Sequence, residues 1–256
     1  MTTTSSPAPS AQPPGASGAS DASARARTAA DPHPGAAEPT PSVVILRLRR
    51  MAGILSLVAG VSVLASIVWQ VSDQVAAGRF MPDEYFAYFT IQTALINIVV
   101  LIVGGVLAFR TPIDPPLYAA IRASVFAYAV VTGVVYNLLL RGIPNDDGYI
   151  APPWPNENLH VWIPIYIALD WLLNPTRPRL RWSTMALAVS FPLIWVGVTM
   201  VRGALTGWYP YPFLEPFGPA GVPGVVQYVV GIAVLIIVLA ALAVAITRLH
   251  HRVARR

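Results

Sequence analysis

The stretch Asn158-Leu-His160-Val-Trp-Ile-Pro164-Ile-Tyr-Ile-Ala-Leu-Asp170-Trp-Leu-Leu is an apolar run with a histidine near one end and an aspartate near the other. Runs of this kind are typical of membrane-spanning segments. An ionisable side chain buried at membrane depth without a partner is costly, so such residues are functional candidates. His160 is the only histidine outside the two end segments of the chain. Imidazole chemistry at membrane depth therefore depends on His160.

The composition indicates an integral membrane protein. Hydrophobic residues make up 55% of the 256 residues and charged residues only 11%, against roughly 25% charged residues in an ordinary soluble domain. The absence of cysteine excludes a disulfide, a thiolate nucleophile and a cysteine metal site. The formal net charge is +5, but most of the arginines lie in tails and short loops, where they set membrane topology. We therefore expect no nucleic-acid partner, and no motif predicts a metal ion or a cofactor.

Six apolar segments predict an all-α fold, an integral membrane bundle of six transmembrane helices. Most segments are close to the roughly 20 residues that a helix needs to cross a hydrocarbon core of about 30 Å. Proline residues predict kinks in the fourth and fifth segments, with the freed carbonyls bonded by neighbouring helices. The segments are 51–71, 86–108, 118–140, 158–173, 183–202 and 224–247, and the prolines are Pro164 and Pro192.

The ends of the chain predict its domain organisation and its topology. Residues 1–42 contain so few large apolar side chains that we expect a disordered tail. A six-helix transmembrane domain at 43–250 and a basic tail at 251–256 follow. An even number of spans places both termini on one side, and the arginines gather in the segments of that side. We expect a multi-pass protein of the plasma membrane with both termini cytoplasmic. These arginines are Arg47, Arg49, Arg50, Arg110, Arg177, Arg179, Arg181, Arg248, Arg252, Arg255 and Arg256.

In this topology Thr90 and His160 lie at matching depth. Each is within about one turn of the outer end of its span, given a rise of about 1.5 Å per residue. A threonine hydroxyl becomes a nucleophile when a base takes its proton, and an imidazole with an ordinary pKa of about 6.5 suits that role. We predict Thr90 as the nucleophile and His160 as the base. In the alternative, Thr90 bonds to the carbonyl four residues earlier and His160 is an interfacial anchor.

Two carboxylates lie near this histidine in the sequence. Asp170 is ten residues beyond His160, or about 15 Å along a helix, so it cannot orient the imidazole. We expect Asp170 to pair with a loop arginine near the cytoplasmic side. Glu157 lies one turn before His160 and is the nearer candidate for orienting it, although a loop glutamate is also simply solvated.

Four residues are candidates for binding a substrate. Asn97 lies seven residues after Thr90 and faces the same side of its helix. Asn137 is a second amide candidate, and structural hydrogen bonds between helices are the alternative role for both. Trp208 and Tyr209 belong to the aromatic loop 206–215. That loop is either an interfacial aromatic belt or a lid over a lipid-accessible cavity.

Three stretches carry a resemblance. They are Tyr88-Phe-Thr-Ile-Gln92, then Asn158-Leu-His160 with Pro164 and Asp170-Trp-Leu-Leu173, and Arg202-Gly-Ala-Leu-Thr-Gly-Trp-Tyr-Pro-Tyr-Pro-Phe213. Over about residues 45–250 the chain resembles the bacterial Pr6Pr family of membrane proteins, which is similar to the FAR-17a/AIG1-like (androgen-induced protein) family. The resemblance implies a multi-span protein whose eukaryotic relatives hydrolyse fatty acid esters of hydroxy fatty acids with a membrane-embedded threonine and histidine. Thr90 and His160 match those two positions.

These observations leave two classes of function open. In the first, the protein is a lipid-ester hydrolase: His160 takes the proton of Thr90, the threonine oxygen attacks the ester carbonyl, and water resolves the acyl-enzyme. In the second, it is a non-catalytic lipid-binding, transport-related or structural membrane protein whose polar residues line a cavity or join helices. Membrane lipids are the expected partners, with an acyl ester as the substrate of the hydrolase.

Overall fold

The computed structural model describes residues 43–143, 151–174 and 176–253, the last three by their backbone alone. All of them belong to one unit, Pro41–Arg256. Every regular element in these ranges is a helix, which confirms the predicted all-α class. The tail expected to be disordered, residues 1–42, lies outside the described residues, as do the last three residues of the basic tail.

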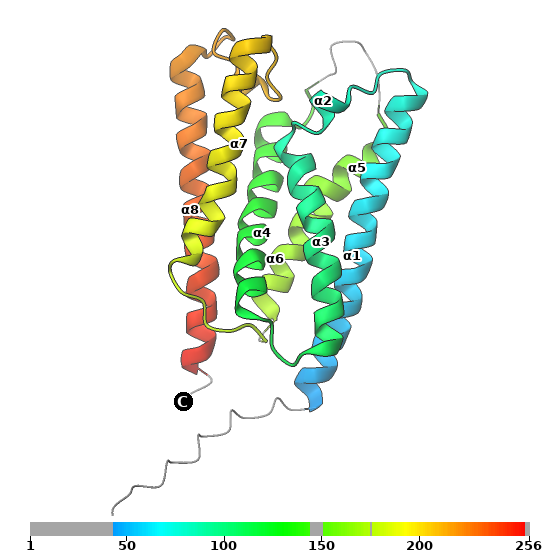
Figure 1. Cartoon of the computed structure of the whole chain (residues 1–256), viewed down its shortest axis with the longest axis vertical. Coiled ribbons are helices and arrows are strands. Elements are labelled where there is room, and N and C mark those ends of the chain that lie inside the picture. Colours follow the sequence, from blue (N-terminus) through cyan, green and yellow to red (C-terminus); the bar gives the residue numbers. More distant parts are fainter. Residues whose placement is uncertain (1–42, 144–150, 175, 254–256) are drawn as a thin grey trace, which may run out of the picture. The chain divides into compact units, whose positions relative to one another are not determined.

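Five helices are long and apolar enough to cross a membrane, and Figure 1 shows them running along one another. The membrane-type bundle is thereby confirmed, with five such helices and not the six that were expected. They are α1 (Val43–Ala76), α3 (Phe89–Arg110), α4 (Pro116–Val135) with its π-helical extension η1 (Tyr136–Leu140), α7 (Thr184–Thr206) and α8 (Gly221–Val253).

The fourth predicted span, 158–173, is the one that differs. It belongs to a helical run of three pieces, α5 (Pro153–Glu157), the π-helical turn η2 (Asn158–Trp162) and α6 (Ile163–Leu173). Polar residues make this run less apolar than the five spanning helices. The run packs against α1 and α4, so neighbouring helices cover much of it. Two short helices, α2 (Pro82–Tyr85) and η3 (Pro212–Leu214), lie in the connections.

Helix α4 is the centre of the bundle, because it packs against α3, α6, α7 and α8. Four of its alanines are at most 2% exposed, and their small side chains let the neighbouring backbones approach closely. Helices α1 and α3 use glycine for the same purpose, since a Cβ added to Gly53 would lie 2.6 Å from the Cβ of Ala108. The alanines are Ala119, Ala123, Ala127 and Ala129.

Pro164 frees a backbone carbonyl that a neighbouring helix then binds, as predicted. Proline has no N–H, so it cannot donate to the carbonyl of His160 four residues earlier. Asn137 in η1 donates its side-chain amide to that carbonyl at 3.4 Å. Gly133 in α4 permits the close approach, because an added Cβ would lie 3.1 Å from the same oxygen. Pro164 therefore joins the segment of His160 to α4.

A buried ionic network ties helices together near the end of the bundle where α1 begins. Asp114 accepts hydrogen bonds from Arg49 at 2.7 Å and from Arg122 at 2.5 Å. Arg122 also pairs with Asp170. The prediction that Asp170 pairs with a loop arginine is wrong, since Arg122 lies within α4. The physical reason is that α4 and α6 pack against each other, which brings the two charges together inside the bundle.

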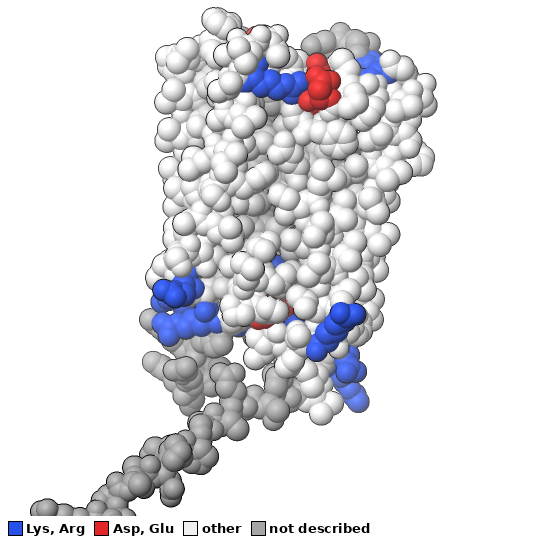
Figure 2. Space-filling model, in the orientation of Figure 1, with Lys and Arg blue, Asp and Glu red and all other residues white. Residues whose placement is uncertain are grey.

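Exposed arginines gather at this same end of the bundle. Helix α1 begins there and α3 and α8 end there (Figure 1), and Figure 2 shows blue side chains collected at that end. The opposite end carries α2, η3 and the start of α3, where the candidate site lies. The exposed arginines of α1, α3 and the connection before α7 are Arg47, Arg50, Arg110, Arg179 and Arg181.

Candidate functional site

Thr90 is the second residue of α3. Tyr88 caps the helix with an extended backbone (φ −63°, ψ 133°), so the helix begins at Phe89. The N–H groups in the first turn of a helix lack helical acceptors, and the helix dipole is positive there. Thr90 is buried, with 9% of its surface exposed. Negative charge that develops near its hydroxyl is therefore stabilised by the start of α3.

Thr90 and His160 are in hydrogen-bond contact. The Oγ1 atom of Thr90 lies 3.3 Å from Nε2 of His160, and His160 is only 8% exposed. The two residues are 70 positions apart in the sequence and come from α3 and η2. The expected matching depth is thus accompanied by direct contact between these segments.

The second ring nitrogen sets the tautomer of His160. Its Nδ1 lies 2.9 Å from the backbone carbonyl oxygen of Asn156. A carbonyl oxygen only accepts hydrogen bonds, so Nδ1 carries the hydrogen of the neutral imidazole and Nε2 carries the lone pair. The hydroxyl of Thr90 consequently donates to Nε2. In this arrangement an imidazole can take the proton of an attacking hydroxyl.

Contacts from three helices hold this imidazole in place. The ring of Tyr136 stacks on that of His160 with centroids 3.9 Å apart. The side-chain oxygen of Asn156 accepts a hydrogen bond from Gln70 at 3.2 Å, and Gln70 in turn accepts one from the hydroxyl of Tyr85 at 2.9 Å. The residue that orients His160 is thereby tied to α1 and α2.

Glu157, the nearer carboxylate candidate for orienting His160, pairs with Arg141 at the surface and does not orient the imidazole. Both of its carboxylate oxygens accept hydrogen bonds from Arg141 at 2.7 Å, and both side chains of this pair are more than a third exposed. A surface pair of this kind contributes little to stability. The backbone carbonyl of Asn156 takes the orienting role, because it lies 2.9 Å from Nδ1.

Tyr211 is a site residue that the sequence did not single out. Its buried hydroxyl accepts a hydrogen bond from the backbone N–H of Thr90 at 3.4 Å. Burial raises the pKa of Tyr211 to about 12, so the hydroxyl keeps its proton and remains a donor. Its ring stacks on Phe213 with centroids 5.1 Å apart. The aromatic loop was a signal for a lid, but only the fold selects Tyr211 within it.

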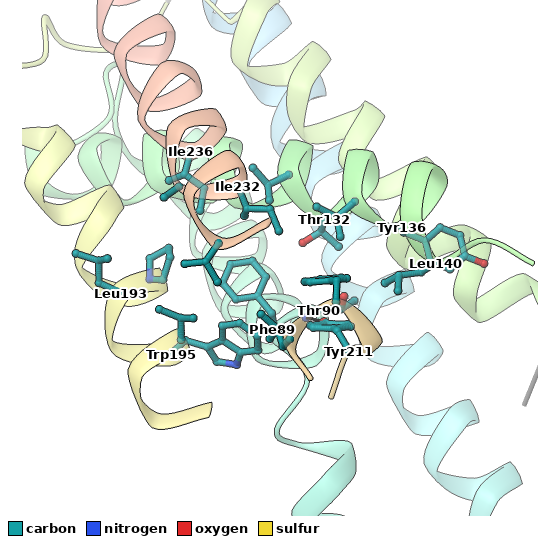
Figure 3. A pocket seen from close by; sticks show the side chains of 18 of the residues that line it. Phe89, Thr90, Thr132, Tyr136, Leu140, Leu193, Trp195, Tyr211, Ile232 and Ile236 are labelled. Carbon is teal, nitrogen blue, oxygen red and sulfur yellow. Dashed lines mark hydrogen bonds between the residues drawn. The ribbon is translucent and has the colours of Figure 1, made fainter. Parts of the chain in front are cut away.

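Two cavities meet at Thr90. The apolar cavity, of about 90 Å³, lies between α4, α7 and α8 (Figure 3), and its lining includes Val131, Val189, Leu193, Val229, Ile232 and Ile236. The polar cavity, of about 470 Å³, lies beside α1, α2 and η2, and its lining includes Gln70, Asp73, Gln74, Arg79, Glu84 and His160. Both cavities are lined by Thr90, Tyr136, Leu140 and Tyr211.

The two predicted amides do not belong to the lining of either cavity. Asn137 donates to the backbone carbonyls of Gly133 and His160 at 2.8 and 3.4 Å, which is a structural role. Asn97 is buried in α3, about 10 Å beyond Thr90 along the helix. The structure therefore separates both amides from the contact between Thr90 and His160.

The two predicted aromatic residues of the loop also lie outside the lining of both cavities. The ring of Trp208 packs edge-on against Tyr88, with centroids 5.8 Å apart. The ring of Tyr209 covers Gly203, where an added Cβ would collide with it. These contacts anchor the loop, and Tyr211 is the aromatic residue that reaches the site.

Comparisons with known proteins return no relative. No family model matches the chain, and no curated protein and no solved structure match it either. Among the described residues, no three histidine, aspartate or glutamate side chains form a group that could hold a metal ion.

Proposed function

We propose that the protein is a membrane-embedded hydrolase of lipid esters, with Thr90 as the nucleophile and His160 as the general base. One observation carries the proposal: the hydroxyl of Thr90 lies 3.3 Å from the nitrogen of His160 that bears the lone pair. That distance is slightly longer than an ordinary hydrogen bond, as is usual for catalytic pairs without substrate. A threonine that served only to join helices would need no oriented imidazole.

The reaction follows from this pair. His160 takes the proton of Thr90 while the threonine oxygen bonds to the carbonyl carbon of the ester. The bond from that carbon to the alcohol oxygen then breaks, and His160 gives the proton to the departing alcohol. Water then attacks the carbonyl carbon of the acyl-threonine while His160 takes a proton from this water. The bond from that carbon to the threonine oxygen breaks, and His160 returns the proton to this oxygen. The products are an alcohol and a carboxylic acid.

The negative oxygen of the tetrahedral intermediate needs hydrogen-bond donors. We assign this role to the hydroxyl of Tyr211 and to the N–H groups in the first turn of α3. The hydroxyl of Tyr211 already lies at this turn, 3.4 Å from the backbone nitrogen of Thr90. Its raised pKa, about 12, keeps it protonated, so it is able to donate to the oxyanion.

The surroundings of the site support a lipid substrate. Five helices have the length and composition to cross a membrane, and one wall of the site is an apolar cavity. The resemblance to the FAR-17a/AIG1-like family is a prediction that favours the same chemistry. We further propose that the arginine-rich end of the bundle is cytoplasmic, in the plasma membrane, because short loops rich in arginine stay on that side. The site then faces the outer leaflet.

Labelling with an alkyl fluorophosphonate tests the proposal directly, because this reagent modifies only an activated hydroxyl. The purified protein in detergent is compared with Thr90→Ala and His160→Ala variants, and the modified residue is identified by mass spectrometry. Thr93→Ala is the matched control, since Thr93 lies one turn further along α3 and donates to the carbonyl of Phe89 at 2.9 Å.

We expect labelling of Thr90 in the wild type and in Thr93→Ala, and none in the other two variants. If the wild type stays unlabelled under conditions that label a known serine or threonine lipid hydrolase, the hydrolase proposal fails. The polar residues then serve lipid binding or helix packing, the second class of function that the sequence leaves open.

A further inference from the structure

We propose that the two cavities divide one substrate at its ester bond, with the acyl chain in the apolar cavity and the leaving alcohol in the polar cavity. This inference rests on the proposed function and names its substrate class: an ester of a single acyl chain with a polar alcohol. The two cavities share Thr90, so a carbonyl carbon within reach of its hydroxyl has one substituent on each side.

The position of His160 sets which half lies on which side. His160 lines the polar cavity and is not part of the lining of the apolar one. The group that receives the proton of His160 when the ester breaks is the oxygen of the leaving alcohol. That oxygen must be close to Nε2, so the alcohol leaves through the polar cavity. The acyl chain therefore lies in the apolar cavity.

The side chains that line the two cavities agree with this placement of the acyl chain and the alcohol. Branched aliphatic side chains of α4, α7 and α8 dominate the apolar cavity, which suits a hydrocarbon chain. Amide and charged side chains of α1, α2 and the turn between them contribute to the polar cavity. An alcohol that carries hydroxyl or charged groups is solvated by these side chains, whereas a hydrocarbon would remove water from them without replacing its hydrogen bonds.

One polar atom inside the apolar cavity marks the end that receives the carbonyl. The hydroxyl of Thr132 is buried, at 7% exposure, and has no hydrogen-bond partner among the described residues. Figure 3 places Thr132 between Ile232 and Thr90, within the cavity wall. A buried hydroxyl without a partner is costly. The carbonyl oxygen of an ester bound at Thr90 would give it one, beside the donors already assigned to that oxygen.

The size of the apolar cavity limits how much of the chain is enclosed. Its volume of about 90 Å³ is smaller than the roughly 150 Å³ of a cavity that holds a benzene molecule, so only the first few carbons fit inside. Leu193 forms part of the wall and is 57% exposed. The cavity therefore reaches the lipid-facing surface of α7, and the rest of the chain extends into the bilayer.

Hydrolysis of glycerol monoesters with acyl chains from acetyl to decanoyl tests this division. In the wild type we expect kcat/KM to rise about fourfold for each of the first few added carbons, and then to level off. Ala233→Phe fills the apolar cavity, because Ala233 belongs to its wall. In this variant kcat/KM should no longer rise with the length of the acyl chain. Ala245→Phe is the matched control on the exposed side of α8 and should behave as the wild type.

The outcomes separate this inference from the proposed function. An equal loss for the acetyl and decanoyl esters in Ala233→Phe would overturn the division of the substrate while leaving the hydrolase in place. If the wild type hydrolyses no ester, the proposed function fails. Photo-crosslinking of a bound ester then tests whether its two halves occupy the two cavities. A diazirine on one of the first few carbons of the acyl chain should then label α7 or α8, and one in the alcohol should label α1 or α2. The reverse pattern, or a mixture, would refute the division.

Discussion

The backbone carbonyl of Asn156 accepts a hydrogen bond at 2.9 Å from Nδ1 of His160, one turn later in the same helical run. This contact alone decides which imidazole nitrogen bears the lone pair. The oriented nitrogen faces Thr90, and the orienting group is a main-chain oxygen and not a carboxylate. A neutral orienting group avoids a second charge in a buried site, where an unpaired charge is costly.

Replacing Gln70 by alanine should loosen the segment that orients His160. Gln70 holds the side chain of Asn156 at 3.2 Å, and loss of a neutral hydrogen bond of about 1 kcal/mol corresponds to about fivefold in rate. We expect kcat to fall by about this factor with KM unchanged. Gln74→Ala, one turn further along α1, is the control, since Gln74 lines the polar cavity and should act through KM.

The rate of ester hydrolysis should fall at acid pH and should show no second fall up to about pH 10. Activity should fall at acid pH, because a protonated His160 cannot take the proton of Thr90. Burial disfavours the phenolate of Tyr211 and raises its pKa to about 12, so its hydroxyl should still donate at about pH 10, where an ordinary tyrosine ionises. Steady-state rates between acid pH and about pH 10 check both points. An activity that persists unchanged in acid would contradict the role of His160.

Tyr211→Phe removes the proposed oxyanion donor and keeps the aromatic ring. We expect kcat to fall about a hundredfold to a thousandfold with little change in KM, because the lost hydrogen bond forms only in the transition state. Tyr209→Phe, in the same loop but outside the lining of both cavities, should retain the wild-type rate. Equal effects of the two substitutions would mean that the loop acts only through its packing.

The ionic network should contribute to stability and not to chemistry. Asp170→Ala leaves Arg49 and Arg122 with Asp114 as their shared carboxylate. One positive charge of the network is then uncompensated inside the bundle, at a cost of about 3–5 kcal/mol in the free energy of unfolding. The double variant Arg122→Met/Asp170→Leu removes both charges and should recover part of that loss. Denaturation in detergent, followed by circular dichroism, measures the difference. A single variant as stable as the wild type would show that the network contributes nothing.

Much of the fold follows from local sequence. The helices of the bundle can be predicted because an apolar run of about 20 residues has few stable alternatives to a membrane helix. The fourth segment is the exception. Its proline, histidine and aspartate reduce its apolar character, and α1 and α4 cover polar groups that a lone helix would expose to lipid. The sequence of the fourth segment does not show which helices pack against it.

Some residues of the candidate site can also be predicted from the sequence, and others cannot. Thr90 and His160 can be named from the sequence, because an imidazole and a hydroxyl at one depth of a bundle are chemically recognisable. Asn156 cannot, since it acts through a carbonyl that every residue possesses. Asn97 and Asn137 show the opposite case: their amides are suitable for binding a ligand, but Asn137 donates to backbone carbonyls and neither residue lines the two cavities.

The sequence by itself therefore determined the helical membrane class of this protein and the two residue types that could carry its chemistry, because composition and hydropathy act locally along the chain. Only the tertiary structure decided that Thr90 touches His160, that Tyr211 joins them, and that an apolar and a polar cavity meet at that point. These contacts link residues that lie far apart in the chain, and the close packing of α3, α4 and η2 brings them together. Hydropathy alone does not encode such contacts.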